Sequence, residues 1–85
     1  MEYLYTNITS NTTTTITDRP CILHSVTVNT AAAGVISIND GTDSVATLKS
    51  DVAEGTYTYD VVLRNYLQIV TAGSPNITVA YKPTA

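Results

Sequence analysis

The stretch Thr56-Tyr57-Thr58-Tyr59-Asp60-Val61-Val62-Leu63 alternates between two sets of side chains along its whole length. Aromatic and aliphatic side chains take every odd position, whereas the even positions are mostly polar. Successive side chains of a β-strand point to opposite faces, so this period of two predicts a strand with one face in a core. The side chains expected to face that core are Tyr57, Tyr59, Val61 and Leu63.

Shorter alternating segments flank this strand at close intervals, as in a sandwich or barrel. Their inward stripes are expected at Val26/Val28, Ile36/Ile38, Leu67/Ile69 and Ile77/Val79/Tyr81. Leu23 is out of phase with Val26, and a bulge near His24 and Ser25 would restore the phase by adding one residue. We therefore predict an all-β fold, a small antiparallel β-sandwich of about eight short strands, with a jelly roll among the arrangements it could take.

The first twenty residues differ from the rest. Residues 2–8 alternate as a strand, and Thr12–Thr17 is a threonine run with little to bury. Threonine is β-branched and favours extended backbone, so this run is expected to be an edge strand or an extended arm. Pro20 ends it because proline lacks the backbone N–H. We expect one domain overall, with an N-terminal strand or arm at residues 1–20, a β-sandwich at 21–85, and a tail from Lys82.

Composition points to a protein that is covered by another. A domain of 85 residues buries only about 60–65% of its unfolded surface, so small domains rely on disulfides, metals or partners. The single cysteine rules out an internal disulfide, and the single histidine leaves too few ligands for a zinc site. Charged residues make up 13% of the chain, about half the usual ~25%. We therefore expect a homo-oligomer, with a trimer as its form.

The distribution of charge argues against nucleic acid and membrane partners. The net charge is −3, and the four cations (Arg19, Lys49, Arg64 and Lys82) are scattered, whereas phosphate binding needs clustered cations. No apolar run approaches the ~20 residues that span a bilayer. Glu2 stands where a signal peptide would carry positive charge. The protein is therefore expected to be made and left in a cytoplasm, or to reach the outside by a route other than secretion, of which a virus particle released by lysis is one.

Three groups of side chains are candidates for chemistry. Asn39–Asp43 could bind a cation through Asp40 and Asp43, but a hairpin turn is the favoured interpretation because calcium usually takes six to eight oxygens. His24 could be a general base, yet Ser25 beside it should point to the opposite face, so a structural or interface histidine is favoured. Cys21 has no nearby basic cluster and is interpreted as a small buried hydrophobe. We expect no catalytic residue, no cofactor and no metal.

Two further patterns have a functional and a structural interpretation. The tyrosines could line a sugar-binding face, but the phase of Tyr57 and Tyr59 favours packing in a core or a subunit interface. The other tyrosines are Tyr3, Tyr5, Tyr66 and Tyr81. Three matches to the N-glycosylation acceptor begin at Asn7, Asn11 and Asn76. Such matches arise easily by chance in a threonine-rich chain, and no secretory signal supports them.

The order of motifs from Leu23 to Tyr81 resembles small structural proteins encoded among the virion genes of tailed bacteriophages. The motifs are Leu-His-Ser-Val-Thr-Val-Asn-Thr (23–30), Ile-Ser-Ile-Asn-Asp-Gly-Thr (36–42), Glu-Gly-Thr-Tyr-Thr-Tyr-Asp-Val (54–61), Leu-Gln-Ile-Val-Thr-Ala-Gly (67–73) and Asn-Ile-Thr-Val-Ala-Tyr (76–81). In that family a compact β-sandwich decorates or cements the capsid, or serves as a head-fibre or tail module. The resemblance implies no catalytic residues, and it implies that terminal segments reach a neighbouring chain.

Two functions follow as expectations. The favoured one is a non-enzymatic capsid decoration or cement protein that binds the major capsid protein as an oligomer. The alternative is a receptor- or glycan-binding module of a fibre or adhesin. That module would use three loops that contain no aromatic residue, namely Thr30–Gly34, Asp51–Gly55 and Ala72–Asn76. An enzyme is the least expected class.

Overall fold

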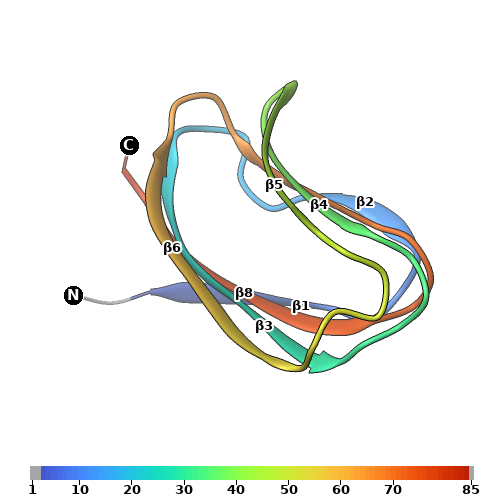
Figure 1. Ribbon diagram of the computed structural model, residues 1–85. Helices are drawn as coiled ribbons and strands as arrows, with labels where there is room; N and C mark the ends of the chain where they lie inside the picture. Colours follow the sequence, from blue (N-terminus) through green and yellow to red (C-terminus); the bar gives the residue numbers. More distant parts are fainter. Residues whose placement is uncertain (1–2, 85) are drawn as a thin grey trace.

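Eight antiparallel strands form two four-stranded sheets in the computed structural model, which describes residues 3–84 (Figure 1). Sheet A has the order β1-β8-β3-β6, and sheet B has the order β2-β7-β4-β5. The strands are β1 (Leu4–Ile8), β2 (Thr12–Thr15), β3 (Cys21–Thr30), β4 (Ile36–Asp40), β5 (Asp43–Leu48), β6 (Gly55–Leu63), β7 (Leu67–Thr71) and β8 (Asn76–Pro83). The predicted all-β sandwich is confirmed.

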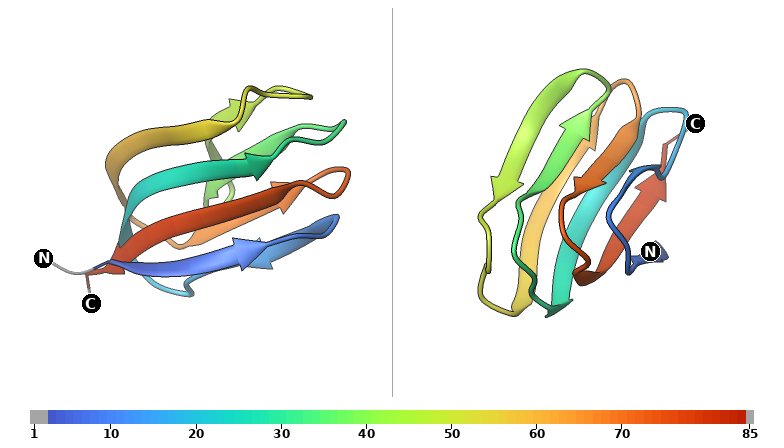
Figure 2. Two further views of the ribbon diagram at one scale, coloured as in Figure 1. Left: turned by 90° about the horizontal axis from the view of Figure 1, so that it is seen from below. Right: turned by 90° about the vertical axis from the view of Figure 1, so that its right-hand side faces the viewer.

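The connectivity is that of a jelly roll. The chain passes from one sheet to the other at every connection except β4–β5, which is a hairpin within sheet B. Apart from β4 and β5, neighbouring strands in each sheet are therefore distant in sequence, as in the eight-stranded double-sheet folds built from two Greek keys. The two sheets lie face to face, with β1 and β2 on one side of the sandwich and β5 and β6 on the other (Figure 2).

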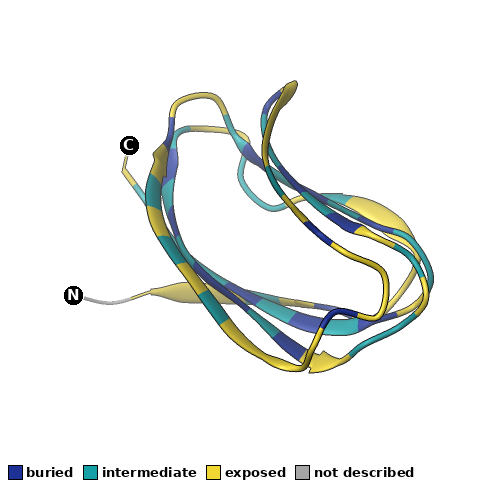
Figure 3. Cartoon of the chain, in the orientation of Figure 1, coloured by how far each residue is buried: buried dark blue, intermediate teal, exposed yellow. Residues whose placement is uncertain are grey.

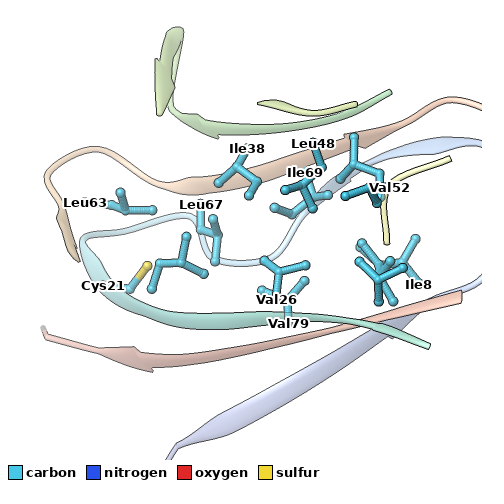
Figure 4. Close-up of a cluster of buried hydrophobic side chains, with 14 residues drawn as sticks. Ile8, Cys21, Val26, Ile38, Leu48, Val52, Leu63, Leu67, Ile69 and Val79 are labelled. Carbon is cyan, nitrogen blue, oxygen red and sulfur yellow. The ribbon is translucent and has the colours of Figure 1, made fainter. Parts of the chain in front are cut away.

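The core lies between the sheets and is almost entirely apolar. Sheet A supplies Val26 and Val79, whose side chains face Ile38 and Ile69 of sheet B (Figure 4). The inward stripes predicted for β3, β4 and β7 are confirmed in full, and Ile77 and Val79 of β8 are fully buried. Ile8 and Val52 join the core although their alternation in the sequence did not single them out. Thr71 is buried as well, and its hydroxyl donates to the Ser10 carbonyl oxygen at 2.7 Å.

Strand β6 is less buried than its alternation predicts. Leu63 is fully buried, but Tyr57, Tyr59 and Val61 are only partly buried and pack against the margin of the core. The reason is position, because β6 is the edge strand of sheet A and has a neighbour on one side only. The sequence pattern indicates which side chains face inward, whereas the place of the strand in the sheet decides how far the opposite sheet covers them.

The bulge predicted near His24 and Ser25 is present. Pairing of β3 with both its neighbours shifts register between Leu23 and Ser25. Against β8 the extra residue is His24, and against β6 a further extra residue lies on β6, at Tyr59–Asp60. The shift turns both Leu23 and Val26 into the core, as their burial shows.

The N-terminal residues are edge strands of the sandwich. Strand β1 pairs with β8 along its whole length, and β2 pairs with β7. Of the two forms expected for the threonine run, the structure has the edge strand, which is largely exposed (Figure 3). The expectation of a tail from Lys82 is wrong, because β8 continues to Pro83, which pairs with Cys21. Proline is tolerated there because the β1 ladder already ends at Tyr81.

Candidate functional site

The double bulge brings together three side chains from distant parts of the chain. His24 Nδ1 lies 2.5 Å from Asp60 Oδ1, which joins β3 to β6. The ring of Tyr3 stacks on the imidazole, with 4.2 Å between ring centroids and 15° between planes. Asp60 has φ of 51°, a left-handed conformation that is uncommon for a residue other than glycine. The bulge thus aims the Asp60 carboxylate at the imidazole and re-aims a side chain that regular pairing would place elsewhere.

The contacts of this cluster connect three segments of the chain. Ser25, the neighbour first considered as a nucleophile, is buried, and no hydrogen bond joins it to His24 within residues 3–84. Asp60 occupies Nδ1 and Tyr3 covers a face of the ring, so the contacts of His24 tie the start of β1 to β3 and β6. Sequence reasoning missed Asp60 because it lies 36 positions from His24. The signal that could have found Asp60 is that it is the carboxylate of a strand that could pair with the bulged strand at His24.

The candidate cation site at Asn39–Asp43 forms a turn, and Asp40 stabilises the neighbouring β6–β7 connection by hydrogen bonds. Both Asp40 carboxylate oxygens accept hydrogen bonds from the backbone, from Asn65 N at 2.8 Å and Arg64 N at 3.1 Å. Asp40 therefore holds the β6–β7 connection against the end of β4, while Asp43 is exposed at the start of β5. Within residues 3–84, no three His, Cys, Asp or Glu side chains are placed to share a metal ion.

Cys21 is a buried thiol at the start of β3. Burial raises the pKa of the Cys21 thiol, while its hydrogen bond with Thr17 lowers that pKa and the charge of Asp40 raises it. Its side chain is fully buried and unpaired to another cysteine. A raised pKa disfavours the thiolate, which is the reactive form, so the interpretation as a small hydrophobe agrees with its position.

The tyrosines do not gather into one face. Tyr57, Tyr59 and Tyr81 turn inward and pack against the core, and the Tyr57 hydroxyl donates to the Ala53 carbonyl oxygen at 2.5 Å. Burial raises the pKa of Tyr59. Tyr3 and Tyr5 instead belong to the exposed margin of sheet A, and Tyr66 is half-buried between β6 and β7. The packing interpretation is therefore confirmed for the tyrosines of β6 and β8.

Asparagine side chains form a polar network on sheet A. Asn7 Nδ2 donates to Asn76 Oδ1 at 2.9 Å and to the Ile77 carbonyl oxygen at 2.8 Å. Asn29 Nδ2 reaches Asn76 Oδ1 at 3.3 Å and Thr78 Oγ1 at 3.2 Å. Two of the three asparagines in glycosylation-type motifs are thus held by the sheet, and the third, Asn11, is exposed between β1 and β2.

The three loops named for a binding module meet at one end of the sandwich. Asp51 N donates to the Ala32 carbonyl oxygen at 3.1 Å, and Gly34 N donates to Ser50 Oγ at 2.9 Å. Ala72 N donates to the Val35 carbonyl oxygen at 3.1 Å. The loops bind one another mainly through their backbones. We call these three connected loops the joined rim.

The strand-paired outward positions of sheet B are uncharged among residues 3–84, and exposed Lys49 directly follows β5 in phase with Thr47. We define the outer face of sheet B by its outward residues Thr13, Thr15, Ser37, Asn39, Val45, Thr47, Gln68 and Val70. All are uncharged, and most are threonine, serine or amide side chains. The outward face of sheet A has the same character at one end, but it also carries Asp60 and Lys82.

Neither a pocket nor a related protein indicates a function for the part of the chain that the structure describes. No cleft or pocket opens anywhere in residues 3–84, so a small molecule would find no concave site there. No helix in this range is long and apolar enough to cross a membrane. No protein-family model matches the chain, and no curated protein matches it.

Proposed function

We propose that this chain is a non-enzymatic structural protein of a virion that decorates or cements the capsid. It would bind the major capsid protein as an oligomer, for which the sequence led us to expect a trimer. The observation that carries the proposal is the outer face of sheet B, whose strand-paired positions are uncharged and mostly polar. Burying these positions against protein desolvates none of the charged side chains whose desolvation is costly when an ordinary protein surface is covered.

Two further features support the virion assignment. The motifs from Leu23 to Tyr81 resemble tailed-phage structural proteins, and the strand order is a jelly roll, an architecture that viral capsid proteins use repeatedly. Fold alone does not assign function, and lectins share the same architecture, so the jelly roll counts as analogy. The virion would accordingly be where the protein resides, after synthesis in the host cytoplasm.

The second candidate is a glycan- or receptor-binding module, and the joined rim of loops favours it. The Asn7–Asn29–Asn76 network lies close to that rim, and amides of this kind can donate and accept hydrogen bonds from sugar hydroxyls. Asn76→Ala would remove the shared acceptor of this network. A glycan that binds the protein and loses its affinity in Asn76→Ala would establish this second function in place of the first.

A positive charge added to the outer face of sheet B is expected to weaken shell binding. The test mixes the purified protein with empty shells of the major capsid protein from the same genome and measures co-sedimentation. Thr47→Lys places an ammonium at an exposed outward position near the end of β5, and we expect at least a tenfold loss of affinity, equivalent to about 1.4 kcal/mol. Thr58→Lys is the matched control, because Thr58 is also exposed, on β6 of the other sheet.

The two variants separate the outcomes clearly. Binding by the native protein and by Thr58→Lys, with loss in Thr47→Lys, supports the proposal and places the contact on sheet B. No co-sedimentation of the native protein at any shell concentration would overturn the decoration function. Equal loss in both variants would contradict the assignment of the contact to sheet B.

A further inference from the structure

The four edge strands of the sandwich are protected to different degrees. On one side, β6 carries Asp60 within a bulge, and β5 begins at Asp43 and carries an extra residue, Val45, opposite the Ile38–Asn39 step of β4. Charges and bulges on edge strands are the usual devices that prevent another strand from pairing with an open edge. Both edges on this side therefore carry protection against strand addition.

The other side has neither device. Strand β1 pairs with β8, and β2 pairs with β7, without any shift in register. Neither β1 (Leu4–Ile8) nor β2 (Thr12–Thr15) contains a charged residue, a proline or a glycine. Regular, uncharged edges of this kind are templates for a further strand. β1 and β2 lie on the same side of the sandwich, opposite β5 and β6 (Figure 2).

Strand β1 also exposes the large apolar side chains of this edge. Tyr5 is 74% exposed and Leu4 is 53% exposed. Tyr5 lies on the outward face of sheet A opposite Ala80, and Leu4 lies on the other face opposite Tyr81. A strand added beside β1 would cover both side chains. The same added strand would also pair with the open backbone groups of this edge.

We propose that β1 is the site at which a second copy of this chain adds to sheet A, β1 against β1 in antiparallel pairing. This choice of partner rests on the difference between the two sides of the sandwich, because β5 and β6 carry charges and bulges whereas β1 and β2 do not. A contact with the opposite side of another copy would pair this edge with β5 or β6, whose bulges and carboxylates oppose it, and β2, the other open edge, offers only threonine side chains. Like edges can meet only about a two-fold axis, in which the same residues of both copies face one another.

The length of β1 sets the register. The five residues Leu4–Ile8 overlap completely with their own copy only when Thr6 lies opposite Thr6 of the other chain. In that register Leu4 lies opposite Ile8 on the core side, and Tyr5 lies opposite Asn7 on the outward side. Leu4 therefore meets the apolar Ile8, whereas Tyr5 meets the polar Asn7, and directly opposite pairs are the unit that stabilises a sheet.

This inference deepens the proposed self-association and rests on it, whereas shell binding through the outer face of sheet B does not depend on it. A pair of five-residue strands is a small contact compared with the roughly 1,200–2,000 Å² of stable complexes. The dimer is therefore expected to form in a concentration-dependent manner. A trimer would instead require β1 to meet a different surface of its neighbour.

Cross-linking through a cysteine at the axis tests the register. In Thr6→Cys, two thiols would face each other across the axis, with Cα atoms about 4.5–5.5 Å apart, which suits a disulfide. We expect a mild oxidant to produce a covalent dimer of the folded variant. Thr58→Cys on β6 is the control and should stay uncross-linked, and the native Cys21 is fully buried. Equal cross-linking of both variants, or none in Thr6→Cys, would overturn the inference.

A charge on the edge tests the same contact without a covalent bond. Tyr5→Lys places two ammonium groups near the axis, and we expect the dissociation constant of the dimer to rise at least tenfold. Val62→Lys is the matched control, because Val62 is 64% exposed on β6, the opposite edge of the same sheet. Sedimentation of the native protein as a trimer would overturn the two-fold contact and leave the proposed function standing. Loss of the dimer in Val62→Lys but not in Tyr5→Lys would show that the copies meet through β6, and would overturn the inference.

Discussion

Replacing Ile69 with alanine is expected to lower the free energy of unfolding by about 3 kcal/mol. Ile69 is fully buried at the middle of β7, between β2 and β4, where its neighbours cannot close the space it leaves. The loss adds the transfer of three carbon atoms to a residual cavity. Because small domains are stable by only about 5–15 kcal/mol, this single change would remove a large part of the total.

Chemical denaturation of the native and Ile69→Ala proteins, followed by circular dichroism, measures the effect. Val62→Ala is the control, since the side chain of Val62 is mostly exposed and the same kind of truncation should change stability by less than about 0.5 kcal/mol. Val61, which is only partly buried at the margin of the core, should fall between the two. A loss below half a kilocalorie in Ile69→Ala would mean that β7 faces the core with its other side.

Gly73→Ala is expected to destabilise the protein by about 3 kcal/mol or more, because strain and a collision coincide there. Gly73 has φ of 76°, which a residue with a Cβ adopts only at a cost. An added Cβ would lie far inside van der Waals contact with the Ala33 carbonyl oxygen of the β3–β4 loop. The two loops bind each other through their backbones nearby, so neither can withdraw without breaking hydrogen bonds.

Gly55→Ala separates the two causes. Gly55 also has positive φ, of 143°, but nothing lies within 4 Å of an added Cβ. Its replacement should therefore show the backbone strain alone and cost clearly less than Gly73→Ala. Thermal unfolding of both variants gives the comparison. Equal losses would show that the close approach of the β3–β4 and β7–β8 loops contributes nothing to stability.

Local alternation was enough to predict the strands and most of the core. Val26, Ile38 and Ile69 are buried as their period indicates, and even the bulge at His24 follows from the phase error of Leu23. The alternation of side chains along the sequence does not predict the order of strands within a sheet. That order leaves Tyr57 and Val61 at the margin of the core, because β6 is an edge strand.

The candidate site depended on long-range geometry for the same reason. The partner of His24 is Asp60, which the pairing of β3 with β6 brings near, and the partners of Asp40 are backbone groups of the β6–β7 connection. The difference between the protected and open edges likewise appears only once the sheet order is known. Composition still indicated the main property of the surface, because a chain with 13% charged residues cannot cover both sheets with charge.

The central claim is that this β surface exists to be covered by other protein, and the native mass of the chain in solution tests it most directly. Sedimentation equilibrium across micromolar concentrations, alone and with capsid shells present, measures that mass. We predict a multiple of the mass of one chain that falls on dilution, and depletion of the free protein by the shells. A species that remains a single chain at every concentration and is left in solution by the shells would contradict the claim.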